Sequence, residues 1–285
     1  MSPVRKLAAL PFDVRPGEVA HNLALALAGL ADAAAQQAQL LVLPEKWTTS
    51  FLPSYAEAML EESERALATM DAAAREAGLT VIGSAPAGRG PRGKPYNQVH
   101  FLGAAGMHRP YAKRVLFSPT GEGRQVARGE VLPPVLPTPL GAVCAVVCYD
   151  LRFPELTREA FYQPADLLAV PAQWPHPRTA VWELLCRARA CENQQWLLSC
   201  NRAGTAGLDG KHLMDFPGTA LLVDPDGEIA ARRDDGGLLV AEMDLDRSAA
   251  CRKRVPCLRD LKLAGLVPSH VDSTGSAQES GAGDR

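Results

Sequence analysis

The hydrophobic positions of the chain fall into short apolar runs separated by longer polar or amphipathic stretches. Apolar runs of about four to eight residues, bounded by turn-forming residues, are typical of strands buried on both faces. Such runs predict strands at residues 6–13, 40–45, 79–85, 96–103, 140–148, 166–174 and 196–201. Residues 219–233 contain an Asp-Gly turn and predict a hairpin, and we expect residues 237–245 to form the strand beside it.

Between these runs, apolar residues recur at helical spacing. Leu23, Leu27 and Leu30 predict a first helix within an Ala-rich stretch. The capping-box pattern of residues 54–57 predicts the start of a second helix, which should end at Gly78. Two more helices are expected, one from about Pro154 and one whose apolar positions are Val181, Leu184, Leu185 and Ala188. Strands that alternate with helices and end in hairpins predict an α/β layered fold with mixed sheets.

Two stretches depart from this alternation. Residues 108–139 contain few helical signals and many Pro, Gly and charged residues, so we expect a long irregular loop there. Residues 268–285 are rich in Ser, Gly and Ala with almost no large apolar residues, which predicts a disordered C-terminal tail. Since no linker interrupts residues 1–267, we expect a single domain over that range.

Composition and charge narrow the function classes. The 285 residues carry 30 Lys and Arg against 32 Asp and Glu, a balance that gives no electrostatic reason to expect nucleic acid or a membrane surface as a partner. No apolar stretch is as long as a membrane-spanning helix, and the N-terminus has no signal-peptide core, so the expected location is the cytoplasm. The seven cysteines form no Cys-x-x-Cys pair and are expected to be reduced thiols.

Cys148 ends an apolar run and is followed at once by polar and charged residues. Pro154 and Glu155 suit the first turn of a helix, so Cys148 is expected at a strand-to-helix turn. A helix N-terminus there would lower the pKa of the thiol and present N–H groups to an oxyanion. A cysteine that only closes a buried strand remains the commoner case. Cys144 is about 13 Å away along a regular strand, too far for a disulfide.

Three kinds of side chain could act together with this thiol: a histidine, Glu45 and Lys113. No histidine has a signature that pairs it with Cys148, so a Cys–His dyad stays open but unsupported. Glu45 ends the run 40–45, where partial desolvation suits a general base, although a rim glutamate paired with Lys46 would look the same. Lys113, in the segment YAKRVLF, could place positive charge beside an oxyanion or could simply extend from a sheet edge.

Glu45, Lys113 and Cys148 occur in this order, each at the end of a strand-like segment. With their surroundings they resemble the carbon–nitrogen hydrolase (nitrilase) superfamily, whose catalytic set is Glu-Lys-Cys. The resemblance covers residues from about 5 to 260. It rests on four motifs: LPEKW at 43–47, YAKRVLF at 111–117, CYDLRFPEL at 148–156 and RARACENQQWLLSCNRAG at 187–204.

This resemblance implies a four-layer αββα sandwich with two mixed β-sheets, assembled as a homodimer or a higher homo-oligomer. It implies a second catalytic glutamate, Glu122, seven residues before Gly129, although Val126 and Arg128 depart from the family's usual residues. No metal or organic cofactor is implied, and no Cys/His spacing typical of a metal site is present.

The mechanism implied by the resemblance is covalent. Glu45 takes the proton of Cys148, and the thiolate attacks an amide carbonyl while Lys113 and the backbone N–H of Tyr149 hold the oxyanion. Ammonia leaves, and a water activated by Glu45 hydrolyses the thioester. Glu122 would position the substrate or Lys113.

Within the family, the block around Cys148 and the element AQW at 172–174 are most similar to those of ω-amidases, which cleave the terminal amide of short dicarboxylate monoamides. Arg114, Arg152 or Arg202 could bind the carboxylate of such a substrate, and each could equally be a structural ion-pair residue. Trp174 could line the pocket or belong to the core.

The alternatives on the same catalytic residues are a deaminated-glutathione amidase, an N-carbamoyl hydrolase and a nitrilase. An inactive relative that acts as a binding protein is an alternative of a different class, which the intact Glu-Lys-Cys set disfavours. A thiol redox or metal-binding protein is the remaining one, and it lacks a Cys-x-x-Cys pair.

Overall fold

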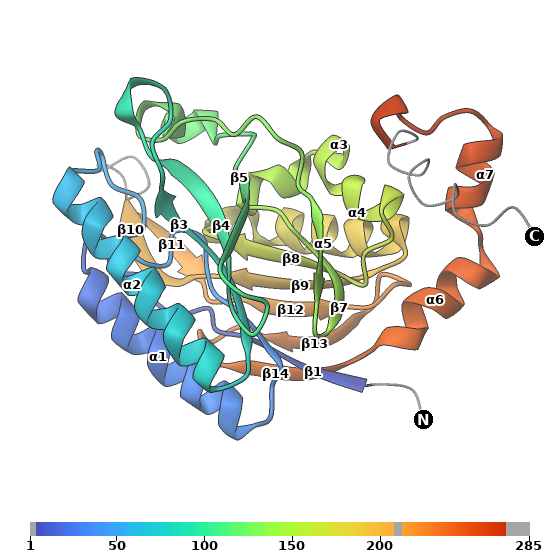
Figure 1. Cartoon of the computed structure of the whole chain (residues 1–285), viewed down its shortest axis with the longest axis horizontal. Coiled ribbons are helices and arrows are strands. Elements are labelled where there is room, and N and C mark those ends of the chain that lie inside the picture. The colour runs from blue at the N-terminus through green and yellow to red at the C-terminus, as the bar shows by residue number, and fades with distance from the viewer. Residues whose placement is uncertain (1–3, 208–212, 272–285) are drawn as a thin grey trace, which may run out of the picture.

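A computed structural model describes residues 4–207 and 213–271. Two six-stranded sheets lie face to face (Figure 1). The first sheet has the order β14 (Leu239–Asp244), β1 (Val4–Ala9), β2 (Leu40–Val42), β3 (Thr80–Ala87), β4 (Tyr96–Gly103) and β5 (His108–Ala112). The second has the order β13 (Ile229–Arg233), β12 (Ala220–Val223), β9 (Trp196–Asn201), β8 (Leu167–Ala172), β7 (Gly141–Ala145) and β6 (Val135–Thr138).

Both sheets are mixed, as the sequence predicted. Strands β1, β2 and β3 are parallel, as are β7, β8 and β9, whereas the outer strands of each sheet pair antiparallel. Parallel strands covered on both faces read as continuous apolar runs, which is why these segments were found from hydrophobicity alone. A separate ribbon of β10 (Ala203–Gly207) and β11 (Leu213–Pro217) lies outside the two sheets.

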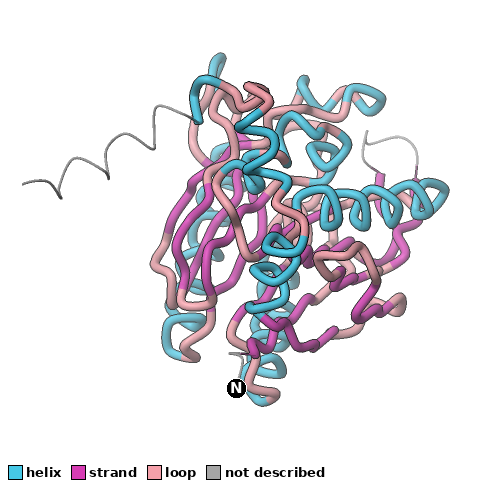
Figure 2. The backbone as a smooth tube through the Cα atoms, turned by 90° about the vertical axis from the view of Figure 1, so that its right-hand side faces the viewer, coloured by secondary structure: helices cyan, strands magenta, loops and turns pink. Residues whose placement is uncertain are grey.

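Helices cover the outer faces of both sheets and complete an αββα sandwich (Figure 1 and Figure 2). Helices α1 (Val19–Ala35) and α2 (Glu57–Glu76) pack on the first sheet, and α5 (Thr179–Asn193) packs on β9 and β12 of the second. The short helices α3 (Pro154–Thr157) and α4 (Glu159–Tyr162) precede β8. Helices α6 (Leu245–Arg254) and α7 (Cys257–Leu263) lead away from the sheets along one side of the molecule (Figure 1).

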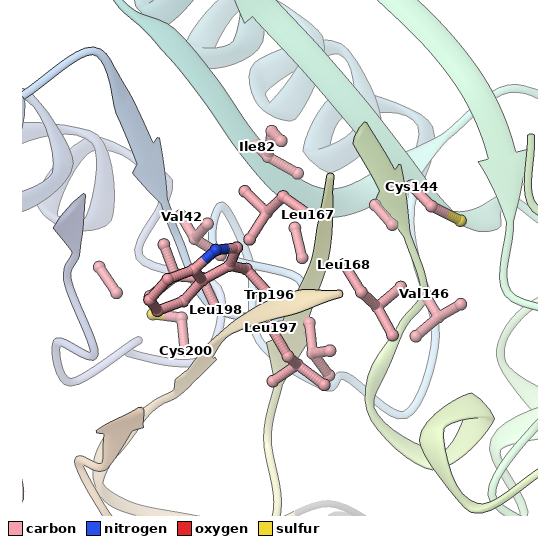
Figure 3. Packing of buried hydrophobic residues seen from close by; sticks show 14 of the residues in the cluster. Val42, Ile82, Cys144, Val146, Leu167, Leu168, Trp196, Leu197, Leu198 and Cys200 are labelled. Atoms are coloured by element: carbon pink, nitrogen blue, oxygen red, sulfur yellow. The ribbon is translucent and has the colours of Figure 1, made fainter. Parts of the chain in front are cut away.

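The main hydrophobic core lies between the sheets. Val42 and Ile82 of the first sheet face Leu167, Trp196 and Leu198 of the second (Figure 3). These side chains are 3% exposed or less, so the sheets are held together by continuous apolar burial. A second core lies under α1 and α2 and includes the partly buried Leu23 and Leu27 of the predicted first helix. None of the helices in the described ranges is long and apolar enough to cross a membrane.

Two local predictions, for the sheet of β14 and for the start of α2, were wrong. Strand β14 pairs with β1 in the first sheet and not with the β12–β13 hairpin, because the segment after β13 carries the chain from one sheet to the other. Helix α2 starts at Glu57 with Ala56 as N-cap, and no side chain caps it, so the pattern at 54–57 forms no capping box. The predicted end of α2 at Gly78, with φ of 69°, is confirmed.

The buried face of α5 also differs from the prediction. Trp182, Cys186 and Ala190 face the sheet, whereas Leu184 is 66% exposed and Val181 is 38% exposed. The stretch 108–139 contains β5 and β6 at its ends and is irregular only between them. Residues 268–271 of the predicted tail are ordered, since His270 lies 2.9 Å from Glu159, and residues 272–285 lie outside the described ranges.

Candidate active site

The candidate residues lie at neighbouring strand ends of the two sheets. Glu45 follows β2 and Lys113 follows β5, both from the first sheet, whereas Cys148 follows β7 of the second. Glu122 begins a 3₁₀ turn, Glu122–Arg124, in the segment between β5 and β6. Because the two sheets pack face to face, residues up to 103 positions apart in the sequence reach one site.

Lys113 joins the two glutamates. Its Nζ lies 2.8 Å from Oε1 of Glu45 and 2.8 Å from Oε2 of Glu122. Asn97 donates from Nδ2 to the same two carboxylates, at 2.7 Å to Glu45 and 3.1 Å to Glu122. All four side chains are at most 1% exposed. A buried hydrogen-bonded network of this kind holds its members in fixed positions, although Oδ1 of Asn97 accepts no hydrogen bond from the described residues.

The charges in this network stabilise one another. Burial alone would lower the pKa of Lys113, but the carboxylates of Glu122 and Glu45 outweigh it and hold that pKa well above its ordinary value. Burial alone would raise the pKa of Glu122, but Lys113 and Lys46 outweigh it and lower that pKa to about 2. Lys113 is therefore a cation and Glu122 an anion throughout the neutral pH range.

Glu45 is also bound from the second sheet. The backbone N–H of Gln173 donates to Oε2 of Glu45 at 3.1 Å, and Nε2 of Gln173 donates to the backbone oxygen of Glu45 at 2.6 Å. Gln173 follows β8 directly. The two oxygens of the Glu45 carboxylate therefore face different sheets, and the orientation of the carboxylate depends on how the sheets pack.

Cys148 occupies a sharp turn at the end of its strand segment. Its φ of 47° lies in the left-handed region, which a side chain adopts at a cost of about 1–3 kcal/mol and which is often found at functional sites. It begins a 3₁₀ helix, Cys148–Arg152, before the four-residue helix α3. The side chain is 7% exposed and reaches the floor of a pocket.

The sequence led us to expect a lowered thiol pKa, and the direction is the opposite. Burial and the carboxylate of Glu45 raise the pKa of Cys148 well above its usual value, while Lys113 and the Gln173 backbone oppose the shift. The helices that follow Cys148 are too short and too irregular to offset burial. The resting thiol is therefore protonated, and a neighbouring base must remove its proton before it can act as a nucleophile.

The pocket above Cys148 has a volume of about 240 Å³. Its walls are mainly aromatic: Tyr149, Trp174 and Phe117. Trp174 is held in place because its Nε1 donates to the backbone oxygen of Arg178 at 2.9 Å. Tyr149 packs edge-to-face on Phe117, with the ring centroids 5.0 Å apart. A pocket of this size and lining suits a small organic molecule.

Two arginines, Arg152 and Arg178, line the same pocket. The guanidinium carbon of Arg152 lies 5.5 Å from the ring centroid of Trp174, and that of Arg178 lies 5.8 Å from the ring centroid of Phe117. Neither guanidinium pairs with a carboxylate of the described residues. The pocket therefore presents positive charge at its walls and the thiol at its floor.

The other two arginines considered from the sequence are elsewhere. Arg114 lies outside the pocket lining, and its Nη1 donates to the backbone oxygen of Glu130 at 3.0 Å. Arg202 is buried outside the pocket lining, where it pairs with Asp13 at 2.6 Å and donates to Oε1 of Gln173 at 3.2 Å. Of the predicted site residues, the structure thus brings together Glu45, Lys113, Glu122, Cys148, Tyr149, Arg152 and Trp174.

Several members of the site were not found from the sequence. Asn97 is a polar residue inside the predicted strand 96–103, and it is buried. Its polar character within an otherwise largely apolar strand was the only signal that we could have used to find it. Gln173 and Arg178 follow β8 in a Pro-rich turn, and only Trp174 between them was singled out. Lys46 was considered as a partner of Glu45, but it faces Glu122, with its Nζ 3.7 Å from Oε1.

Asp150 connects the segment of Lys113 to the turn of Cys148. Its Oδ1 accepts from the backbone N–H of Val115 at 2.9 Å, and its Oδ2 accepts from the hydroxyl of Tyr111 at 2.9 Å. Oδ2 also accepts from the backbone N–H of Val147 at 3.3 Å. The side chain is fully buried, and burial raises the pKa of this carboxyl group to about 7. Asp150 thus fixes the separation between the two segments.

One anion-binding group is available beside the thiol. The backbone N–H of Tyr149, next to Cys148, donates to no other group among the described residues. Such an N–H group, together with the Lys113 ammonium, is the kind of donor set that stabilises an oxyanion. Within the described ranges, no three His, Cys, Asp or Glu side chains come together as a metal site would require.

A pocket lined by a buried thiol and by Tyr149, whose backbone N–H has no partner in the described part of the chain, with a carboxylate and an ammonium buried behind the thiol, is typical of a cysteine hydrolase site. The carbon–nitrogen hydrolase family model matches residues 6–253, and the chain belongs to this family. It is therefore a hydrolase of carbon–nitrogen bonds other than peptide bonds.

Among curated proteins, the 2-oxoglutaramate amidase of Bacillus subtilis (strain 168) is 30% identical over 264 residues, which cover 90% of this chain and 97% of the relative. The ω-amidase YafV of Yersinia enterocolitica is 34% identical over 227 residues, which cover 79% of this chain and 85% of the relative.

Among solved structures, an amidase from Nesterenkonia sp. superposes with a TM-score of 0.76 at 29% identity, over 88% of this chain and 94% of that one. A structure of a mutant of the amidase from Nesterenkonia sp. AN1, at 28% identity, carries the acetamide moiety of fluoroacetamide on its active-site cysteine. These similarities confirm the predicted four-layer sandwich and show that the chain is similar to amidases that act through a cysteine.

Proposed function

We propose that the chain hydrolyses the terminal amide of a small carboxylate-bearing substrate through a thioester on Cys148. The observation that carries this proposal is the network in which Lys113 bridges Glu45 and Glu122 beside the buried thiol. The similarity to a 2-oxoglutaramate amidase and an ω-amidase supports the same class of substrate.

The first half of the reaction releases ammonia. Glu45 takes the proton of Cys148, which is needed because the thiol pKa is raised. The thiolate forms a bond to the amide carbon, and the oxygen becomes an oxyanion stabilised by Lys113 and the backbone N–H of Tyr149. The carbon–nitrogen bond then breaks, the nitrogen takes the proton from Glu45, and ammonia leaves an acyl thioester on Cys148.

The second half restores the enzyme. Glu45 accepts a proton from water, the resulting hydroxide adds to the thioester carbon, and the carbon–sulfur bond breaks. The product is the carboxylic acid, and the thiolate recovers the proton held by Glu45. Glu122, hydrogen-bonded to Lys113 and Asn97, keeps the ammonium charged and oriented in both halves.

Arg152 and Arg178 supply the preference for a carboxylate. Both line the pocket, and neither has a carboxylate partner in the described part of the chain. A guanidinium binds a carboxylate through charge-assisted hydrogen bonds. The aromatic walls formed by Tyr149 and Trp174 would contact the short carbon chain between the carboxylate and the amide.

A second copy of the chain is the partner that we propose. Leu184 and Val181 lie three residues apart on α5 and are both exposed, so they form one apolar patch on the outside of the helix. Sedimentation of the wild-type protein should show a dimer or a larger assembly. In Leu184→Glu, the mass of the sedimenting assembly should be lower. A wild-type monomer would contradict this proposal and leave the catalytic one untouched.

The test of the proposed function is ammonia release from a matched panel of 2-oxoglutaramate, succinamate, N-carbamoyl amino acids and simple nitriles, with release of cysteinylglycine measured for deaminated glutathione. We expect the monoamides with a free carboxylate to be the best substrates and Cys148→Ala to release no ammonia. Full activity in the Cys148→Ala protein, or no ammonia from any compound, would contradict the proposal.

A further inference from the structure

Lys46 is a buried cation next to the candidate active site. It follows Glu45 directly, has a φ of 45°, and is 0% exposed. Its Nζ lies 3.7 Å from Oε1 of Glu122 and 3.9 Å from the ring centroid of Phe51. This ammonium has no hydrogen-bond partner among the described residues.

Burial of the Lys46 ammonium costs free energy, so its presence needs an explanation. A buried ammonium loses the free energy of its hydration. One ion contact without a hydrogen bond offsets only part of that free energy. A methionine of similar length would fill the same space beside Phe51 without this cost. The only anion that lies within 4.0 Å of the Lys46 Nζ in the described part of the chain is Glu122, which Lys113 approaches on its other oxygen.

The charges around the thiol balance only if Lys46 is counted. Glu45 and Glu122 carry two negative charges, and Lys113 and Lys46 carry two positive ones. Without Lys46, the cluster would have one negative charge in excess before Cys148 loses its proton. Like charges at close range disfavour further ionisation, so the thiol proton would leave less readily.

Other titratable and charged groups face the cluster and do not change the sign of this effect. Asp150, near Lys113, has a pKa raised by burial to about 7, and Tyr111 donates to it. The ring centroid of Tyr55 lies 5.3 Å from the Lys46 Nζ. Arg202 is paired with Asp13, and Arg152 and Arg178 lie at the pocket walls. In every protonation state of Asp150, removal of Lys46 makes the cluster more negative by one charge.

We propose that Lys46 is a positioning residue of this active site: it neutralises Glu122, so that the buried Cys148 thiol beside Glu45 loses its proton at a lower pH. Lys46 thus acts on the nucleophile through charge balance and does not touch the substrate. The inference rests on the proposed role of Cys148 as the nucleophile.

The test is the pH dependence of alkylation by iodoacetamide, in which the thiolate forms a carbon–sulfur bond and iodide leaves. Peptide mass spectrometry confirms that the adduct is on Cys148. In Lys46→Met, we expect the profile to move to higher pH by about one unit, with an alkylation rate about tenfold lower on its acidic side. The pH profile of kcat/KM should move in the same direction. Lys253→Met, which removes an exposed lysine on α6, is the matched control and should leave both profiles unchanged.

A double variant separates charge from packing. Lys46→Met with Glu122→Gln removes one charge of each sign, so the alkylation profile should return toward that of the wild type, whether or not turnover survives. Lys46→Gln, which also removes the charge, takes the place of Lys46→Met if that variant does not fold. An alkylation profile that does not move in Lys46→Met, or a double variant shifted as far as the single one, would overturn the role of Lys46. A wild-type protein that is not alkylated at Cys148 would instead contradict the proposed function.

Discussion

At the scale of single residues, the proposed chemistry starts from an unfavourable environment for the thiol. Burial keeps Cys148 protonated, and we propose that the adjacent carboxylate of Glu45, held by Lys113, Asn97 and Gln173, takes its proton. A pre-formed thiolate is therefore not required at rest. The nucleophile is produced when a base and an oxyanion-binding ammonium act together on one substrate.

Glu45→Gln should lower kcat by about a hundredfold to ten-thousandfold, because the buried thiol loses its base. Ammonia release at saturating substrate measures this loss, and far-UV circular dichroism shows whether the fold is retained. Glu18→Gln, at an exposed position before α1, is the control. Activity within threefold of wild type in Glu45→Gln would show that another group removes the proton.

Arg178→Gln should lower kcat/KM about tenfold to a hundredfold for a monoamide that carries a carboxylate, since one charge-assisted hydrogen bond is worth about 1.5–3 kcal/mol. It should leave kcat/KM for a neutral amide of the same length nearly unchanged. Arg114→Gln, which removes an arginine outside the pocket, should change neither value. Equal losses for both substrates in Arg178→Gln would indicate a structural role for this residue.

At the scale of elements, the site depends on close contact between β5 and the segment that carries Glu122. The backbone N–H of Gly129 donates to the oxygen of Lys113 at 2.9 Å. A Cβ atom at position 129 would lie 2.0 Å from the backbone oxygen of Ala112, directly before Lys113. Only glycine allows this approach, which gives a physical reason for the glycine seven residues after Glu122.

Gly129→Ala should therefore displace the segment of Glu122 from β5 and lower kcat at least tenfold. Forced separation of packed backbones costs about 1–3 kcal/mol, so the urea midpoint should fall as well. Gly93→Ala is the control for an alanine in an open turn, because no atom lies within 4 Å of its Cβ position, although its φ of 71° makes it strained. A Gly129→Ala protein with normal kcat would show that this contact does not position the site.

Helix and strand identities were predictable where the apolar pattern was strong, and the failures have local physical causes. The sheet of β14 was predicted wrongly because its pairing with the distant strand β1 leaves no signal in the apolar pattern near residue 240. The face of α5 was misassigned because Trp182 and Cys186 cover the sheet while the apolar Leu184 is exposed. Glu45, Lys113 and Cys148 were found from their motifs, whereas Asn97 and Gln173 contribute only through three-dimensional proximity.

At the scale of the whole molecule, the site joins the two sheets. Glu45 and Lys113 follow strands of one sheet and Cys148 and Gln173 follow strands of the other, so the proposed mechanism requires the packed sandwich. The same buried charges make the stability of the fold depend on pH. Glu122 has a folded pKa of about 2 against an ordinary value of 4.5.

A carboxyl group whose pKa is lowered by folding stabilises the protein when it is ionised. Its contribution is complete above pH about 4.5 and is lost as the pH falls toward 2. We expect the free energy of unfolding, measured by urea titration, to decrease over this window. Glu122→Gln should be less stable than wild type at pH 7 and should lose less stability on acidification. Glu228→Gln, in an exposed ion pair, should follow the wild-type curve, and an unaltered acid response in Glu122→Gln would contradict this role.

The most direct test of covalent catalysis by Cys148 is intact-protein and peptide mass spectrometry after acid quench during turnover of 2-oxoglutaramate or succinamate. The proposed mechanism predicts a transient adduct on the peptide that contains Cys148, with the mass of the substrate less that of ammonia. Cys148→Ala should form neither the adduct nor ammonia. Ammonia release at the wild-type rate from the Cys148→Ala protein would contradict the mechanism.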